Sequence, residues 1–143
     1  MMTANLSELE LHEGWWESDP DRLRARFSFP MFWATGNAST AVLYVELAPG
    51  RGNGRHTDTP EEILLVLNGE VEVEVGGETA VAGPGTLVLV PSMIPHRFSN
   101  VGETTARIVG FFSSNTVIAE FEEPVQPLGR ATVGTPTPEM VRR

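Results

Sequence analysis

The amino-acid sequence predicts an all-β domain, a sandwich or barrel of short antiparallel strands. The 143 residues include 14 glycines and 11 prolines, a density that favours many tight turns over a helical bundle. Strand-like segments are separated by turn signals at intervals of roughly eight to twelve residues, which is typical of sandwiches and barrels. We find no segment with convincing helical periodicity.

The expected strands follow from alternation or from short apolar runs. The first alternates Leu23, Ala25, Phe27 and Phe29 with polar residues. Two runs that are apolar at every position, Ile63–Leu67 and Leu87–Val90, predict strands buried on both faces. Between them, Asn68-Gly69 is the strongest hairpin signal. The full expected set is Arg22–Phe29, Thr40–Leu47, Ile63–Leu67, Val71–Val75, Thr79–Ala82, Leu87–Val90, His96–Ser99, Arg107–Phe112 and Thr116–Phe121.

The length fits one domain, and composition divides the chain into three parts. We expect an N-terminal arm over residues 1–21, a barrel over residues 22–121 and a proline-rich tail over residues 122–143. The tail is expected to be extended or disordered, with a position across the barrel or a partner subunit as an alternative. On this reading, deletion of residues 132–143 leaves the fold intact, because their composition buries little apolar surface.

Charge and residue usage exclude several classes of function. A formal net charge of −9 gives no electrostatic footprint for nucleic acid or an anionic membrane. The chain has no cysteine and no lysine, which excludes thiolate chemistry and Schiff-base catalysis. We find neither a signal peptide nor an apolar run of about 18 residues, so we expect a cytoplasmic protein.

Two histidines and two carboxylates form the one pattern with clear chemical meaning. In an extended segment, His56 and Asp58 point to the same side, and Glu62 keeps that parity beyond a break at Thr59-Pro60. His96 follows after the next turn and loop. Such ligands suit Fe(II), Mn(II), Ni(II) or Zn(II). On spacing alone, two ordinary histidines at loop edges remain an equally good interpretation.

Two linked motifs then resemble those of the cupin superfamily, in particular small single-domain, quercetin-dioxygenase-like cupins. Residues Gly50-x5-His56-x-Asp58-x3-Glu62-x6-Gly69 resemble the first motif, G-x5-H-x-H-x3,4-E-x6-G, and Gly85-x5-Pro91-x-Met93-x2-His96-x3-Asn100 resemble the second, G-x5-P-x-G-x2-H-x3-N. The resemblance covers about Thr40 to Phe112. It implies a double-stranded β-helix, or jelly-roll barrel, with one divalent metal held by His56, Glu62 and His96.

The sequence departs from the family pattern at two positions. Met93 replaces the glycine of the second motif, and Asp58 stands where the family usually has its second histidine. Asp58 is then a fourth ligand, a base just outside the ligand sphere, or a solvated loop residue in a site that has lost its metal. We take the four-ligand set, His56, Asp58, Glu62 and His96, as the main prediction, with Asp58 and Glu62 as candidate proton-transfer groups.

The resemblance does not choose a reaction. The main expectation is a metal-dependent enzyme acting on a small organic substrate in the barrel, as a dioxygenase-like oxidoreductase. The alternatives are a noncatalytic small-ligand binder and a metal-dependent isomerase or lyase. Arg51, Arg55 and Arg97 lie near the site in sequence and are candidates for binding a substrate carboxylate. We also expect a homodimer, with the Arg22–Phe29 strand as a candidate for exchange between subunits.

Overall fold

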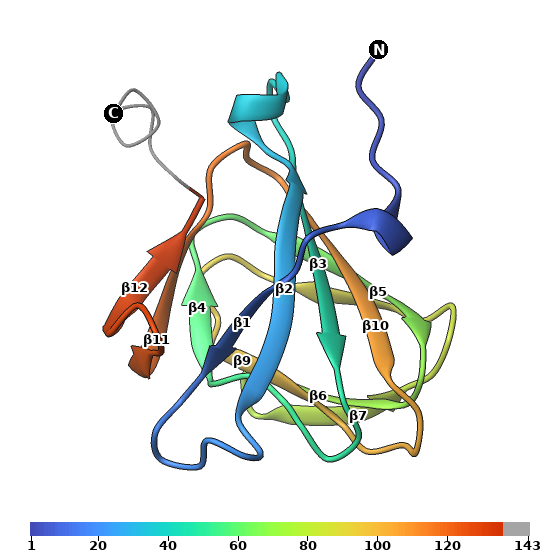
Figure 1. Ribbon diagram of the computed structural model, residues 1–143, viewed down its shortest axis with the longest axis vertical. Helices are drawn as coiled ribbons and strands as arrows, with labels where there is room; N and C mark the ends of the chain where they lie inside the picture. The colour runs from blue at the N-terminus through green and yellow to red at the C-terminus, as the bar shows by residue number, and fades with distance from the viewer. Residues whose placement is uncertain (136–143) are drawn as a thin grey trace.

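A computed structural model describes residues 1–135, which fold into two six-stranded antiparallel sheets that face each other (Figure 1). One sheet, here sheet A, has the strand order β1-β2-β3-β10-β5-β8, and the other, sheet B, has the order β12-β11-β4-β9-β6-β7. The strands are β1 (His12–Trp15), β2 (Arg24–Met31), β3 (Ala41–Leu47), β4 (His56–Asp58), β5 (Glu62–Asn68), β6 (Val71–Val75), β7 (Glu78–Ala82), β8 (Leu87–Val90), β9 (His96–Asn100), β10 (Ala106–Phe112), β11 (Ile118–Val125) and β12 (Arg130–Gly134). The predicted all-β jelly roll is therefore confirmed.

The hydrophobic core lies between the sheets, where alternate residues of each strand point inward. Leu64 and Val66 of β5, Val71 of β6 and Ile108 of β10 are among its most buried members. The helical content of the described chain is two short 3-10 turns, Leu6–Glu8 and Trp33–Thr35. Among the described residues, no helix has the length and apolar character needed to cross a membrane.

The prediction that Ile63–Leu67 and Leu87–Val90 are buried on both faces is wrong. Both strands alternate, and their outward residues are open: Ile63 is 42% exposed, Leu87 65% and Leu89 57%. The reason is that β8 is an edge strand of sheet A, whose outer face here carries no covering layer within the described chain. An unbroken apolar run looks the same in sequence whether its second face meets protein or solvent.

The Asn68-Gly69 turn is present, and Gly69 has a φ of +85°, as such a turn requires. Its flanking strands, however, pair with different partners: β5 lies between β10 and β8 in sheet A, and β6 lies between β7 and β9 in sheet B. The turn therefore carries the chain from one sheet to the other. The predicted hairpin pairing of these two strands is wrong.

Both ends of the described chain add strands that the sequence analysis missed. β1 pairs with β2, and Trp15 forms a further bridge with Gln126 beside the C-terminal strands. The predicted last strand, Thr116–Phe121, in fact continues to Val125 and is followed by β12, which pairs with it. The proposed deletion from residue 132 would cut into β12. Residues 136–143 of the predicted tail lie outside the described residues.

Candidate metal centre and cavity

His56 and His96 face each other at the centre of sheet B. They are directly paired across the short β4 strand and β9, and their ring centroids lie 4.2 Å apart. Both side chains are buried, His96 completely. Phe121 of the neighbouring β11 stacks on His56 with a centroid distance of 4.4 Å. The pairing of two strands that are forty residues apart in sequence therefore brings the two predicted imidazoles together.

Each imidazole is tethered by a main-chain carbonyl two residues before it. His56 Nδ1 lies 2.9 Å from the Gly54 oxygen, and His96 Nδ1 lies 2.9 Å from the Ile94 oxygen. Because a carbonyl oxygen only accepts hydrogen bonds, Nδ1 must be the protonated nitrogen in each case. In the neutral ring, the lone pair is then on Nε2, the atom directed toward the carboxylates.

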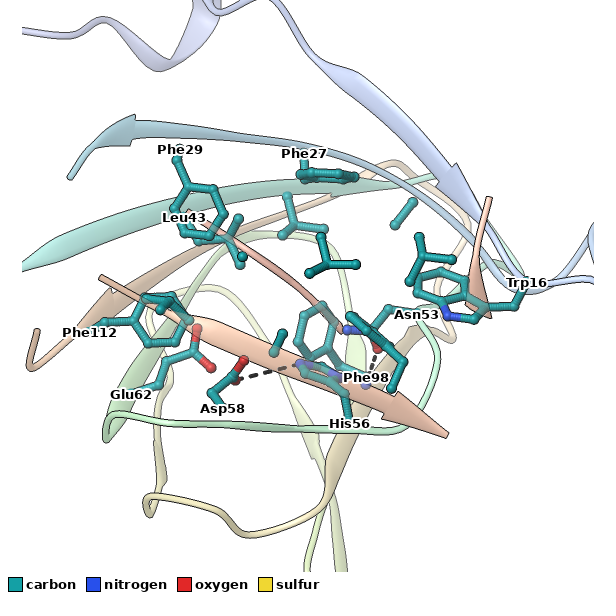
Figure 2. A pocket seen from close by; sticks show the side chains of 18 residues that line it. Trp16, Phe27, Phe29, Leu43, Asn53, His56, Asp58, Glu62, Phe98 and Phe112 are labelled. Atoms are coloured by element: carbon teal, nitrogen blue, oxygen red, sulfur yellow. Dashed lines mark hydrogen bonds and ion pairs between the residues drawn. The ribbon is translucent and has the colours of Figure 1, made fainter. Parts of the chain in front are cut away.

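Asp58 completes a compact group with the two histidines. Its Oδ2 atom lies 3.0 Å from His96 Nε2, and the side chain is buried. The same oxygen lies 3.5 Å from His56 Nε2, the contact drawn in Figure 2. One ligand atom from each of the three residues falls within 4.8 Å of the others. Oδ2 of Asp58 and Nε2 of His96 have no hydrogen-bond partner of suitable geometry in the described structure, although both are buried. Asp58 is therefore part of the cluster and is not a solvated loop residue.

Glu62 reaches the same cluster from the opposite sheet. It begins β5, is 2% exposed, and places Oε1 3.6 Å from His96 Nε2. Its carboxylate lies over Gly110 of β10, where a Cβ atom would overlap Glu62 Oε2. The sequence analysis did not identify Gly110, although a glycine inside the strand pattern Arg107–Phe112 is a known sign of close approach. His56, Asp58 and His96 thus form one compact group, and Glu62 approaches it through His96.

The cluster is electrostatically coupled. Burial alone would lower the pKa of His96, but the adjacent Asp58 and Glu62 carboxylates outweigh it and raise that pKa to about 10. For Asp58, burial opposes ionisation, yet the two imidazoles dominate and lower its pKa to about 2. For Glu62 burial prevails, aided by the negative charge of Asp58, and its pKa is raised. The two carboxylates are therefore not equivalent.

A cavity of about 90 Å³ opens directly above the cluster. His56, Asp58 and Glu62 lie along its polar side, and Asn53 is its other polar side chain (Figure 2). The rest of the wall is aromatic or aliphatic, from Trp16, Ala25, Phe27, Phe29, Leu43, Val45, Phe98, Phe112, Val117, Ala119, Phe121, Val125, Val133 and Gly134. The sequence analysis did not identify Asn53 as part of the site.

The arginines considered as carboxylate anchors lie outside this cavity. Arg55 pairs with Glu74 at 3.2 Å and with Glu122 at 3.5 Å, and Arg97 pairs with Glu74 at 3.0 Å. Arg51 lines a different pocket, together with Arg26 and Glu46. Among the described residues that line the cavity, none is basic apart from the histidine.

The terminal strands form an outer groove beside the cavity. This groove, of about 750 Å³, lies between β1 and the β11–β12 hairpin, and it shares Phe27, Val125, Val133 and Gly134 with the cavity wall. The additional strands missed in the sequence therefore contribute to the cavity wall. His12, the third histidine, is exposed and lines this groove. It does not belong to the buried group that contains His56 and His96.

Comparisons with known proteins agree with this architecture. Residues 43–112 match the family model described as "Cupin domain". No curated protein matches the chain. Among solved structures, the polyketide cyclase RemF from Streptomyces resistomycificus is 17% identical with a TM-score of 0.63, and the match covers 78% of each chain.

Two other similar structures have names that refer to oxalate. A predicted oxalate decarboxylase from Thermotoga maritima is 19% identical with a TM-score of 0.66, covering 79% of this chain and 99% of that one. An oxalate oxidase in complex with glycolate is 24% identical with a TM-score of 0.59, covering 65% of this chain and 53% of the oxidase. At such identities these likenesses show the fold alone. With the family match and the two-sheet architecture, they show that this chain contains a cupin domain.

Proposed function

We propose that the chain is a metal-dependent enzyme in which His56, Asp58, Glu62 and His96 hold one divalent transition metal and a small organic substrate occupies the cavity above it. The observation that carries this proposal is the burial of a carboxylate oxygen, Asp58 Oδ2, against Nε2 of two imidazoles, with one ligand atom from each of the three residues within 4.8 Å of the others. Buried charge of this kind is costly without compensation, and a cation among the three side chains would accept the lone pairs of all of them.

The spacing of the donor atoms fits this assignment. Ligands about 2.1 Å from a metal stand about 3.0 to 3.4 Å from one another in octahedral or tetrahedral geometry. The separations Asp58–His96, Asp58–His56 and Glu62–His96, at 3.0, 3.5 and 3.6 Å, are close to these values. Two neutral imidazoles and two carboxylates balance the charge of a divalent ion and favour Fe(II), Mn(II), Ni(II) or Zn(II) over copper.

The residues around the site support a dioxygenase-like oxidoreductase as the specific activity. A bound metal would supply a Lewis acid and, for a redox-active ion, a site for oxygen. The apolar wall excludes bulk water from the substrate. In the metal-free protein burial raises the pKa of Glu62, so this carboxyl would lose its proton on binding the ion, whereas Asp58, with a pKa of about 2, is already ionised. A particular relationship of this chain to quercetin-dioxygenase-like cupins stays a prediction.

Elemental analysis of the purified protein, followed by oxygen uptake with aromatic and enolic substrates, tests this function. We expect close to one equivalent of Fe, Mn or Ni per chain and oxygen consumption that is lost in the His96→Ala variant. Stoichiometric metal without oxygen uptake, but with substrate isomerisation or cleavage, would favour the isomerase or lyase alternative. Protein that neither contains nor takes up metal would identify a noncatalytic binder.

We further propose that the chain forms a homodimer through the outer face of sheet A. Phe111, Ile63 and Leu89 are direct neighbours across β10, β5 and β8, and all three are exposed. Two copies of a chain with a net charge of −9 repel each other over most of their surface. The row of Phe111, Ile63 and Leu89 carries no charge, so two copies can meet there without this repulsion. The earlier candidate for exchange, Arg22–Phe29, overlaps β2, which already pairs with β1 and β3 of its own chain.

A further inference from the structure

The outer face of sheet B carries a cluster of charged side chains directly behind the two imidazoles. Arg55 precedes His56 in the chain, and Arg97 follows His96. Because adjacent residues of an extended chain point to opposite sides, each arginine lies behind the histidine beside it and outside the cavity. The sequence analysis considered these arginines as substrate anchors, and their contacts indicate a different role.

Both arginines contact one carboxylate, that of Glu74 on β6. Arg55 Nη1 lies 3.2 Å from Glu74 Oε1, and Arg97 Nε donates to Glu74 Oε2 at 3.0 Å, so each carboxylate oxygen serves one arginine. Arg55 Nε also lies 3.5 Å from the carboxylate of Glu122 on β11. The Glu74 side chain is only 17% exposed, which shields its ion pairs from water better than pairs on an open surface. Two arginines and two glutamates balance in charge, so the cluster needs no anionic ligand.

The four side chains come from four neighbouring strand positions of sheet B. In the order β11-β4-β9-β6, the contributing residues are Glu122, Arg55, Arg97 and Glu74. Arg97 and Glu74 are direct partners in the pairing of β9 with β6. Arg55, which immediately precedes β4, reaches Glu74 across the intervening strand β9. The ion pairs therefore join β4 to β6 over the strand that carries His96.

The strand contact behind which this cluster lies is short. Within the described chain, β4 and β9 have a single registered pair, His56 with His96. The next main-chain hydrogen bonds between the two segments are at Asn53 and at Asp58, three and two residues away from His56. By contrast, β6 and β9 pair along five residues. Of the two strands that carry the imidazoles, β4 is therefore the less firmly held, and Glu74 ties it to the well-paired β6.

We propose that Glu74 is a positioning residue: its two ion pairs hold β4 against β9 from the outer face and so keep His56 and His96 at the spacing that a metal requires. This inference rests on the proposed function, because it assigns the support of that metal site. Without the Glu74 carboxylate, Arg97 loses its only ion pair among the described residues and faces the like charge of Arg55. The repulsion acts directly behind the imidazole pair and pushes the two strands apart.

Glu74→Gln tests the proposal, with Glu72→Gln as the matched control. Glu72 lies two residues away on the same face of β6, is exposed and has no ion pair within the described chain. Both variants remove one negative charge, so a general loss of attraction for cations is equal in the two. We expect Glu74→Gln to bind Zn²⁺ about tenfold more weakly than Glu72→Gln in competition with a chromophoric chelator. The visible absorption of bound Co²⁺, which reports ligand geometry, should change in Glu74→Gln alone.

Two further measurements separate positioning from general destabilisation. In the metal-free protein, the main-chain amides of β4 should exchange with D₂O at least about fivefold faster in Glu74→Gln than in Glu72→Gln, while the melting temperatures of the two variants in EDTA should agree within about 4 °C. In a background that carries Arg55→Gln and Arg97→Gln, Glu74→Gln should weaken Zn²⁺ binding less than about threefold, because the partners of Glu74 are already absent.

The outcomes distinguish this inference from the proposed function. Equal Zn²⁺ affinity of Glu74→Gln and Glu72→Gln, or a loss of full size in the background without the two arginines, would overturn the inference and leave the metal site in place. Unmodified protein that binds neither Zn²⁺ nor Co²⁺ would overturn the enzyme proposal. In that case, faster exchange of β4 in Glu74→Gln alone would still support the strand-positioning role, and equal exchange in the two variants would overturn it as well.

Discussion

The inner and outer faces of β5 differ in a way that reverses the usual distribution of polarity. The inward residues are Glu62, Leu64 and Val66, all of them buried. The first side chain that this strand directs into the core is therefore a carboxylate. The outward residues include Ile63, which is exposed, and Leu65, which is half-buried. An acid inside and aliphatic side chains outside both oppose the stability of an isolated domain.

Each reversal therefore indicates a partner that the isolated fold does not supply. For the inner face the partner is the cation proposed for the cluster, and for the outer face it is a second copy of the chain. The two proposals are independent, because the side chains that support them point away from each other across one strand. They can be tested with substitutions at adjacent positions.

The largest expected effect comes from removing the inward carboxylate. Glu62→Gln should weaken binding of Mn²⁺ or Zn²⁺ at least about 100-fold, because one charged ligand is lost. The metal-free protein should keep its free energy of unfolding within about 1 kcal/mol, since burial already disfavours the ionised form of Glu62. Competition with a chromophoric chelator and thermal unfolding in EDTA measure the two quantities.

Ile63→Gln is the matched control for that substitution, with the same new side chain one position further along β5. Its side chain faces outward, so metal affinity should be unchanged. A loss of affinity similar to that of Glu62→Gln would show that the inner and outer faces are not independent.

The outer face should respond to charge. The double substitution Leu87→Glu and Leu89→Glu places four carboxylates at a two-fold interface and should raise the dimer dissociation constant about 100-fold or more, with metal affinity unchanged. Light scattering should give twice the 15.6 kDa of one chain for the unmodified protein. Val101→Glu, at an exposed apolar residue after β9, should leave the dimer intact. An unmodified protein that is monomeric at micromolar concentration contradicts the interface.

Metal binding at the inner face should depend on pH. His96, with a pKa of about 10 in the metal-free protein, must lose its proton to become a ligand. The apparent affinity should rise about tenfold per pH unit between pH 6 and 8, with about one proton released per metal at pH 7. Calorimetry in two buffers of different ionisation enthalpy measures this release. Metal binding without proton release would contradict the ion pairs of His96 with Asp58 and Glu62 in the metal-free protein.

The same pKa shifts predict the stability of the metal-free protein. Asp58, lowered from 3.8 to about 2, contributes stability above pH 3.8 that is lost as the pH falls through 2. His96, raised from 6.5 to about 10, contributes stability below pH 6.5 that is lost as the pH rises through 10. Unfolding in EDTA should therefore show its highest stability between about pH 4 and 6.5. A maximum well above pH 8 would contradict these assignments.

The smallest effect is expected at the glycine behind Glu62. Gly110→Ala places a methyl group against the Glu62 carboxylate and should cost about 1–3 kcal/mol in the free energy of unfolding, with weaker metal binding as that side chain shifts. Gly77→Ala, where a Cβ meets open space, is the control and should be nearly neutral. Equal stability of the two variants would show that Glu62 tolerates displacement.

The sequence predicted the parts of the site that depend on local spacing. His56, Asp58 and Glu62 lie within seven residues, but spacing alone left ordinary loop histidines as an equally good interpretation, and the resemblance to the two cupin motifs was what joined these residues to His96. The turn at Gly69 is specified by its own dipeptide. Even Met93, which replaces the glycine of the second motif, adopts the left-handed φ of 62° for which glycine is suited. The motif therefore preserves backbone shape despite the substitution.

The features that were missed depend on contacts between distant segments. Trp16, Asn53 and Phe121 reach the cavity because β1, β4 and β11 meet there, and nothing in their neighbourhoods specifies that meeting. Strand β12 was missed because Arg130–Gly134 alternates only weakly and follows the proline-rich segment. The prediction that β8 is buried on both faces was wrong because the residues of a strand do not show whether it lies in the centre or at the edge of a sheet.

The two carbonyl tethers at Gly54 and Ile94 bear on how this fold diversifies. Each imidazole takes its orientation from the main chain of its own loop, and the distance between the imidazoles comes from the β4–β9 pairing. Among the aromatic side chains of the described cavity wall, Phe121 is the one that stacks on His56. Mutations elsewhere in that wall can therefore change which molecule is accepted while the donor atoms keep their places, so selection and protein engineering can alter specificity without rebuilding the reactive centre.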